Sequence, residues 1–480
     1  MSNPSIKKNF VFNLINQVVN LIIPFITIPY ISRVLSPSGV GLVSYSESIV
    51  AYFVLVATFG IGIYGQREIS YVRDSLHLRS AVFWNITVLK SLLSLVAFVG
   101  YLGFAYYQEQ QLLYFILSIN IIAVIFDITW FFQGMEQFGK ILTRNLIIKI
   151  LNTASIFIFV KEQQDLNIYV FILSVFVLVS NASLWTYLKA YICKVKLKEI
   201  NPFKHFYAVL SLFIPTIAVQ IYTVLDKTMI CLITQDLQEN GYYEFSQKIS
   251  KITLTIITAL AVVMFSRISF YFSNNDLEKV KSSIYQSYRF AWFLGIPLCF
   301  GLMGISDNFV PWFLGSGYEK VSLLLKISSF LILAIGINNV TGVQYLIPVK
   351  KQNLFTLTVV IGAIVNFVLN LFLIKCYASV GACLASVTAE SVIALVQFYI
   401  VREQFSFIKV IILSTRYLIA GAVMLLIIIF ANKYLTPSIF NTIILVVSGS
   451  IIYFACLILM KDQFVMDNIR ALLDKIKVKI

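Results

Sequence analysis

Charged residues are scarce in this chain of 480 residues, because Asp, Glu, Lys and Arg together account for only 12% of it. Soluble domains carry about 25% charged residues, whereas 59% of this sequence is hydrophobic and its mean hydropathy is +0.87. The composition therefore excludes a water-soluble fold. Apolar runs of about 20 residues recur along the chain, and each is long enough to cross a membrane as a helix.

The sequence also lacks the residue sets that support metal, redox or hydrolytic chemistry. Its two histidines, His77 and His205, are expected to be solvated in loops, and its six cysteines occur singly, without a CxxC pair, as buried thiols. No P-loop, dinucleotide fingerprint or Ser/His/Asp set is present. We therefore expect no enzyme, no metal site and no cofactor. The net charge of +15 is interpreted as a topology signal, not as a sign of nucleic-acid binding.

The apolar runs predict an all-α polytopic membrane protein of about 14 helices, centred near residues 21, 53, 93, 122, 151, 180, 220, 257, 296, 334, 365, 390, 421 and 449. When the loops are sorted alternately, one side holds most of the Lys and Arg residues. The other side holds only Arg33, Lys161, Lys320, Lys375 and Lys433. Because basic loops are retained in the cytoplasm, both termini are predicted to be cytoplasmic.

An internal repeat divides the predicted helices into two sets. Residues 41–70 resemble residues 241–269, residues 23–26 resemble 214–217, and residues 133–140 resemble 344–351. The repeat predicts an N-lobe of helices 1–6 (residues 1–200) and a C-lobe of helices 7–12 (201–402). These lobes would be related by a pseudo-twofold axis along the membrane normal, with a cavity between them. Helices 13–14 (403–460) and an amphipathic cytoplasmic tail (461–480) follow.

Ionisable residues inside predicted spans are costly and therefore indicate a cavity or a partner. Lys90 lies about ten residues into the third span, where it is too deep to reach the interface easily, and we favour a cavity role for it. Glu390 lies at a similar depth among small residues, and its interpretation is open between function and a structural hydrogen bond. Asp127 is attributed to an aromatic belt with Trp130.

A second charged group surrounds the turn between the seventh and eighth spans. Asp226 and Lys248 lie at matching distances from this turn, so they are candidates for an ion pair, while Lys227 and Lys251 add positive charge. A purely structural ion pair is the alternative. In the equivalent helix of the first half, Glu47 is a candidate to balance Arg33.

Several short motifs, in order along nearly the whole chain, resemble those of Wzx-type polysaccharide flippases, which belong to the multidrug/oligosaccharidyl-lipid/polysaccharide exporter superfamily. They are PYISRVLSPSG at residues 29–39, YGQRE at 64–68, DITWFFQG at 127–134, LDKTM at 225–229 and GYYEFSQK at 241–248. The resemblance implies two six-helix lobes around a central cavity. It also implies a flippase that carries undecaprenyl-pyrophosphate-linked oligosaccharide repeat units to the outer leaflet of a bacterial inner or plasma membrane.

The implied mechanism is ion-coupled alternating access, as in an antiporter, with H⁺ or Na⁺ as the coupling ion. A pyrophosphate needs a cationic cavity, so the candidate substrate-binding residues are Arg67, Lys90, Lys227, Lys248, Lys251 and Arg267. The candidate ion-coupling residues are Asp226, Glu390 and Glu47.

The implied partners are the lipid-linked oligosaccharide and membrane lipid, with a polysaccharide polymerase and glycosyltransferases as further candidates. The alternatives are a lipid II or multidrug exporter of the same superfamily, or a membrane polymerase or glycosyltransferase, although the latter usually carry a sizeable outer loop. A further alternative is a scaffold that transports nothing.

Overall fold

The computed structural model describes residues 6–467 and confirms the all-α fold: no strand occurs within this range. Side chains are described there except at residues 6–18, 20–21, 138, 197, 211–212, 214–216, 218–219, 221–222, 259–260 and 262–263. In the described part, eleven helical segments are long and apolar enough to cross a membrane, so the protein is a multi-pass membrane protein. The number of fourteen spans remains a prediction. The repeat match at residues 214–216 and most of the predicted tail lie outside the described residues.

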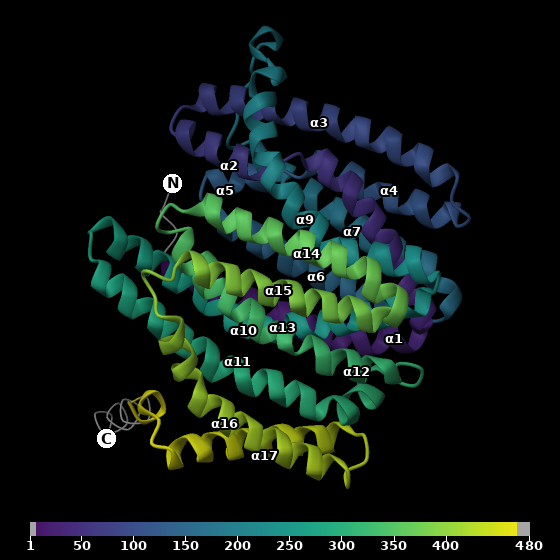
Figure 1. The fold of residues 1–480 in the computed structure, drawn as a ribbon. Helices are drawn as coiled ribbons and strands as arrows, with labels where there is room; N and C mark the ends of the chain where they lie inside the picture. Colours follow the sequence, from purple (N-terminus) through teal and green to yellow (C-terminus); the bar gives the residue numbers. More distant parts are fainter. Residues whose placement is uncertain (1–5, 468–480) are drawn as a thin grey trace. The chain divides into compact units, whose positions relative to one another are not determined.

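The chain divides into two compact units, residues 1–241 and 242–480. In the first unit, long helices are joined by loops, 3₁₀ turns and a few short helices (Figure 1). They are α1 (Ile6–Thr58), α2 (Ile61–Val72), α3 (Leu76–Tyr106), α4 (Gln111–Phe126), α5 (Thr129–Gly134), α6 (Phe138–Phe159), α7 (Leu166–Ser183), α8 (Trp185–Leu188) and α9 (Phe206–Thr234), with 3₁₀ turns at η1 (Gln163–Asp165), η2 (Leu197–Glu199) and η3 (Pro202–His205).

The second unit holds the helices from α10 onward. They are α10 (Leu237–Ser273), whose first turn belongs to the first unit, α11 (Leu277–Leu314), α12 (Glu319–Ser328), α13 (Phe330–Asn338), the π-helical η4 (Asn339–Leu346), α14 (Gln352–Tyr377), α15 (Ser379–Ile400), α16 (Phe407–Asn432) and α17 (Ile439–Leu459). Serine side chains cap α16 and α17: Ser406 accepts a hydrogen bond from the Lys409 N–H, and Ser438 from the Asn441 N–H.

Helix α1 contains two of the predicted spans and bends between them. At Ser36 the backbone adopts φ 60° and ψ 166°, directly before Pro37, whose missing N–H cannot continue the helix. The predicted second span, which was expected to run on to residue 70, is interrupted. Phe59 (φ 45°) and Gly60 (φ 76°) are left-handed, and α2 begins at Ile61. The equivalent helix of the second half, α10, has no such break.

The two glycines that begin the repeat, Gly41 and Gly241, lie at a close backbone contact inside the first unit. A Cβ on Gly41 would lie 1.7 Å from the carbonyl oxygen of Leu237, and a Cβ on Gly241 would lie 2.1 Å from that of Pro37. The buried Asn240 amide donates to the Gly41 carbonyl at 3.1 Å. Only glycine permits two helices to approach this closely, so the repeated glycine has a packing function.

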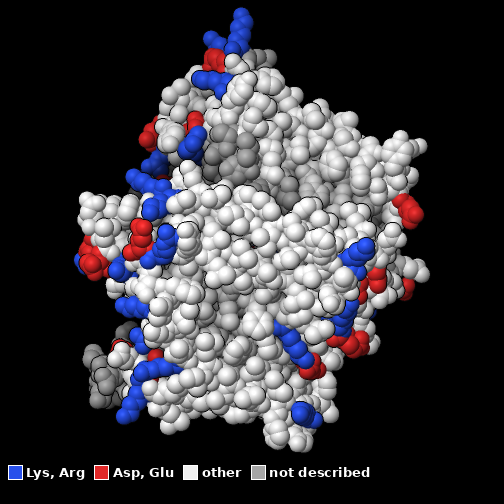
Figure 2. All heavy atoms as spheres, viewed as in Figure 1, with Lys and Arg blue, Asp and Glu red and all other residues white. Residues whose placement is uncertain are grey.

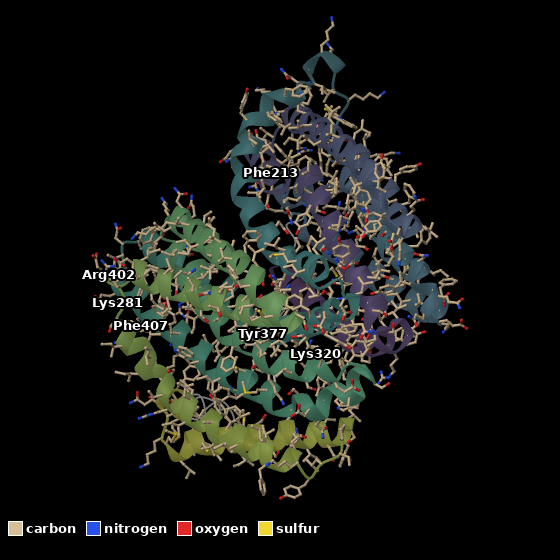
Figure 3. All side chains as sticks on the ribbon, turned by 45° about the vertical axis from the view of Figure 1, so that its right-hand side comes forward. Phe213, Lys281, Lys320, Tyr377, Arg402 and Phe407 are labelled. Carbon is tan, nitrogen blue, oxygen red and sulfur yellow. The ribbon has the colours of Figure 1, made fainter. Side chains whose placement is uncertain are left out.

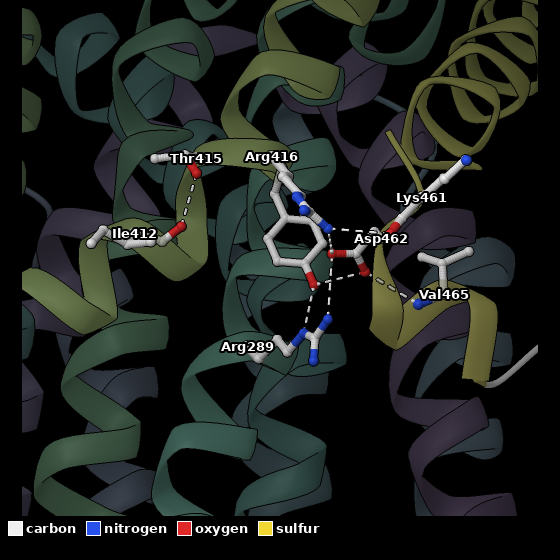
Figure 4. Close-up of polar contacts among 8 residues, drawn as sticks. Arg289, Ile412, Thr415, Arg416, Lys461, Asp462 and Val465 are labelled. Carbon is white, nitrogen blue, oxygen red and sulfur yellow. Dashed lines mark hydrogen bonds and ion pairs between the residues drawn. The ribbon is translucent and has the colours of Figure 1, made fainter. Parts of the chain in front are cut away.

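The last helical pair, α16 and α17, packs along α11 within the second unit (Figure 1). A buried carboxylate secures the end of this pair (Figure 4): Asp462, only 3% exposed, lies 3.4 Å from the Arg289 guanidinium. It also accepts hydrogen bonds from the Tyr417 hydroxyl at 3.2 Å and the Val465 N–H at 3.2 Å. These contacts hold Asp462 against Arg289 of α11 and Tyr417 of α16.

Charged side chains gather near helix ends, while the helix sides are largely uncharged (Figure 2). In the second unit, Lys281, Arg402 and Phe407 lie at one end, and Lys320 and Tyr377 lie at the opposite end (Figure 3). This placement agrees with the alternating assignment of those loops. The expectation that all six cysteines are buried is wrong, because Cys376, near the end of α14, is exposed, while Cys193 and Cys456 are partly exposed.

Candidate functional site

Lys90 is held in the middle of the first unit by a charged partner. Its side chain on α3 is only 3% exposed, and Nζ donates to the backbone carbonyl of Asp127 at 2.6 Å and lies 3.5 Å from the carboxylate Oδ2. Asp127 stands where α4 ends, and its Oδ1 accepts from the Thr129 N–H at 3.0 Å. Because the chain leaves the helix there, its carbonyl is available to the lysine.

The sequence interpretation of Asp127 as a belt residue missed this pair. A signal was present, because Asp127 is the only acidic residue between Glu109 and Glu136, and a deep lysine requires a counter-charge. Helix depth and rotation, which the sequence does not specify, decide that the two groups meet.

Arg67 lies on an exposed part of α2, with 46% of its side chain accessible. Its guanidinium is 3.2 Å from the Glu68 carboxylate and 5.3 Å from the ring centre of Tyr64. The Tyr64 hydroxyl in turn lies 2.7 Å from Nδ1 of His205. The expectation that His205 is solvated is wrong, because it is only 6% exposed. Burial lowers the pKa of His205 below its ordinary value.

Asp226 and Lys227 lie on α9, which packs against α1 in the first unit. Asp226 is 6% exposed and Lys227 is half-buried. The neighbouring Thr228 hydroxyl lies 2.9 Å from that of Ser48 and 3.0 Å from that of Tyr52, both on α1. These hydroxyl contacts hold the two helices in register.

Glu47, which precedes Ser48 on α1, is half-buried. The acidic candidates Glu47 and Asp226 therefore lie on two helices that are joined by hydrogen bonds one or two residues away.

In the second unit, Lys248 pairs with a residue that the sequence analysis did not single out. Its Nζ lies 2.9 Å from the carboxylate of Glu244, which is one helical turn earlier on α10. The Glu244 side chain is buried, whereas the Lys248 side chain remains accessible. Lys251 is exposed on the same helix. Further along α10, Arg267 is exposed, and its Nε donates to the Tyr271 hydroxyl at 3.2 Å.

Glu390 on α15 is bound by a buried amide of the same unit. Asn338 Nδ2 donates to the Glu390 carboxylate at 2.6 Å and to its backbone carbonyl at 3.0 Å. Asn338 is the last residue of α13, directly before the π-helical η4. Short π-helical segments inside helices are frequent at functional sites. The sequence analysis missed Asn338 because an asparagine in an apolar run resembles a structural hydrogen-bonding residue.

An apolar groove lies elsewhere in the second unit. It has a volume of about 310 Å³ and is bounded by α10, α11, α16 and α17. Phe293, Pro297, Gly301, Met424 and Tyr453 are among its lining residues. Such a groove has the chemistry to hold a hydrocarbon chain.

Within residues 6–467, no group of three or more His, Cys, Asp or Glu side chains is arranged to hold a metal ion.

Sequence comparison relates the chain to transporters. Residues 6–272, more than half of the chain, match the family described as polysaccharide biosynthesis protein. A putative O-antigen transporter of Escherichia coli K12 is 21% identical over 408 residues, which cover 83% of this chain and 97% of the relative. A probable low-salt glycan biosynthesis flippase, Agl15 of Haloferax volcanii, is 24% identical over 379 residues. This match covers 77% of this chain and 77% of the relative.

Solved structures show the same fold. The lipid II flippase MurJ in an inward closed conformation has a TM-score of 0.74 at 17% identity and covers 95% of this chain and 99% of its own. An inward-facing multidrug resistance transporter of the MATE family has a TM-score of 0.60 at 13% identity and covers 82% and 98%. The chain therefore belongs to the polysaccharide biosynthesis protein family, as its resemblance to Wzx-type flippases predicted, and it has the fold of the multidrug/oligosaccharidyl-lipid/polysaccharide exporter superfamily.

Proposed function

We propose that this protein is a flippase for lipid-linked oligosaccharides, which it moves from the cytoplasmic to the outer leaflet of a bacterial inner membrane for polysaccharide biosynthesis. The observation that carries the proposal is the family match over residues 6–272, together with relatives that are named O-antigen transporter and glycan flippase. The chain covers 97% of the Escherichia coli relative, so the similarity extends over nearly the whole length of that protein.

The substrate we propose is an oligosaccharide on undecaprenyl pyrophosphate. Its pyrophosphate is anionic and cannot be solvated by lipid, so it requires basic groups that remain accessible inside the protein. Lys227, Lys248 and Lys251 are at least partly accessible on α9 and α10. Arg67 and Arg267, which are exposed on α2 and α10, are suited to receive the headgroup first.

Lys90 requires a different role within this proposal. Its ammonium is covered and is bound to Asp127, so it reaches a phosphate only if that pair opens. We assign to it a conditional role, in which an incoming phosphate competes with the Asp127 carboxylate. The apolar groove between α11, α16 and α17 is suited to the polyprenyl chain, since hydrocarbon chains are stabilised by burial against apolar side chains.

The driving force we propose is a proton or sodium gradient that is coupled through Asp226, Glu390 and Glu47. Each of these carboxylates is at least half-buried, and Glu390 accepts a hydrogen bond from the Asn338 amide. Ion binding would bias an alternating-access equilibrium between inward- and outward-open states.

The test is a flipping assay in proteoliposomes with a fluorescent polyprenyl-pyrophosphate sugar. We expect wild-type protein to flip the lipid, Arg267→Ala to lower the rate about tenfold or more, and Lys375→Ala, an exposed lysine at the end of α14, to leave it unchanged. Substrate binding is measured in parallel to separate the headgroup contact from folding. No flipping by well-folded wild-type protein would contradict the proposal, and normal rates for Arg267→Ala and Lys90→Ala would remove those residues from it.

The same assay separates the alternatives. Faster flipping of lipid II, or export of a cationic drug in preference to the glycolipid, would assign the chain to another branch of its superfamily. An extended glycan in the recovered lipid would indicate a polymerase or glycosyltransferase. Vesicles are therefore extracted after the assay, and the mass of the lipid-linked sugar is measured.

A further inference from the structure

A second pocket, separate from the groove described above, lies in the second unit between α11, α12 and the end of α16. Its volume is about 490 Å³, and its polar lining consists of Asp307, Lys326, Asn432 and Lys433. It belongs to the end of the unit that carries Lys320 and Tyr377 (Figure 3), which the charge distribution assigns to the outer face of the membrane.

The pocket carries an excess of positive charge. The Lys326 ammonium lies 2.7 Å from the Asp307 carboxylate, so these two charges offset each other. Lys433 also lines the pocket and is exposed, and its backbone N–H donates to the Phe430 carbonyl at 3.3 Å, whereas its ammonium makes no hydrogen bond or ion pair with any described residue. One ammonium is therefore left to interact with an anion.

The walls around Lys433 are held by a buried polar network. Asn308, which is 1% exposed, donates to the backbone carbonyls of Leu435 at 3.4 Å and Thr436 at 3.0 Å. Its Oδ1 accepts from the Ser438 N–H at 3.3 Å and from the Thr442 hydroxyl at 2.8 Å. These bonds fasten the turn between α16 and α17 to α11, so the lysine is presented from a pre-organised turn.

Large exposed apolar side chains of α16, of the turn after it and of α17 lie close in sequence to the lining residues. Phe430, Tyr434 and Phe440 are exposed by 62%, 74% and 69%, and Ile429, in the lining itself, by 43%. Aromatic side chains with this exposure at the end of a spanning helix are typical of the membrane interface. A molecule that places an anionic group near Lys433 would therefore lay its apolar part along α16 and α17.

We propose that this pocket binds an anionic glycerophospholipid, with its phosphate against Lys433 and its acyl chains along the exposed apolar side chains of α16 and α17. A zwitterionic phosphatidylcholine fits less well, because its choline carries a positive charge toward the two lysines. The proposal is independent of the transported substrate, since the groove between α10, α11, α16 and α17 is a different cavity.

The experiment is native mass spectrometry of the full-length protein in detergent, titrated with phosphatidylglycerol or phosphatidylcholine. We expect phosphatidylglycerol to bind more tightly to the wild type, and Lys433→Gln to weaken its binding about tenfold, the loss expected for one charge-assisted hydrogen bond. Lys433→Arg retains the charge and should retain binding. Lys375→Gln removes another exposed lysine, which lies outside the pocket, and should leave binding unchanged.

Several outcomes would overturn the proposal. These are equal affinity for the two lipids, unchanged phosphatidylglycerol binding in Lys433→Gln, or equal weakening in Lys375→Gln. Glycerol phosphate without acyl chains that binds as tightly as the lipid would show a soluble-anion site instead. Because Lys433 is exposed, its substitution should leave the thermal midpoint unchanged, and a matching midpoint shows that lost binding is not lost folding. If phosphatidylglycerol binds as proposed while no glycolipid is flipped, the lipid site stands and the proposed function fails.

Discussion

An alanine at Gly41 would place a methyl group against the backbone of the helix that crosses it. The new Cβ would lie 1.7 Å from the Leu237 carbonyl oxygen and 2.7 Å from its carbonyl carbon. Non-bonded heavy atoms prefer separations of about 3.5–4.0 Å, so the two helices must move apart by roughly 2 Å. Because both contact atoms belong to the backbone, no side-chain rotation relieves the clash.

The expected cost follows from two terms. Overpacking of a tight contact costs about 1–3 kcal/mol, and loss of the buried Asn240 hydrogen bond to the Gly41 carbonyl adds about 1–3 kcal/mol. The better helix propensity of alanine recovers about 1 kcal/mol. With each term at the middle of its range, we therefore expect Gly41→Ala to destabilise the first unit by about 3 kcal/mol. For a unit of this size, that loss lowers the thermal midpoint by roughly 6–12 °C.

The assay is thermal unfolding of the purified protein in detergent, with Gly103→Ala as the matched control. Gly103 is an exposed glycine within α3, and a Cβ there would meet nothing within 4 Å. Its substitution should leave the midpoint unchanged or raise it slightly. A Gly41→Ala midpoint within about 2 °C of wild type, or an equal loss in Gly103→Ala, would refute the packing argument.

Three further predictions address charge, pH and orientation. Lys90→Met should lower the free energy of unfolding by about 3 kcal/mol, because it leaves Asp127 without its ammonium partner. Adding Asp127→Asn should recover part of that loss, as measured by thermal unfolding. A double variant that loses as much stability as the two single variants together would contradict the pairing. Because burial lowers the pKa of His205, protonation opposes folding, so stability should be complete above the ordinary value of 6.5 and fall as the pH drops below it. His205→Gln should flatten this dependence of the thermal midpoint on pH, and an unchanged slope would rule it out. Exposed Cys376 should react with a membrane-impermeant maleimide in intact cells, and Cys193 only after permeabilisation; the reverse order would invert the proposed topology.

The sequence by itself determined the fold class. A hydrocarbon core has a set thickness, so apolar runs such as residues 352–377 are recognisable as spans without knowledge of their neighbours. The resemblance and the family match were likewise within reach, because the motifs are local. A loop that contains Arg33 was predicted between the first two spans, whereas the helix continues through Arg33 and bends at Ser36, since proline is tolerated inside many membrane helices.

Only the tertiary structure decided which polar groups meet. Lys90 donates a hydrogen bond to Asp127, Asn338 donates one to Glu390, and His205 shares one with Tyr64. The partners of these three pairs are 37, 52 and 141 residues apart in the sequence. Such contacts depend on the rotation and depth of each helix, which are set by the packing of many weakly specific apolar side chains. A sequence states the cost of placing a charge in a membrane, whereas the partner that offsets this cost is determined by packing.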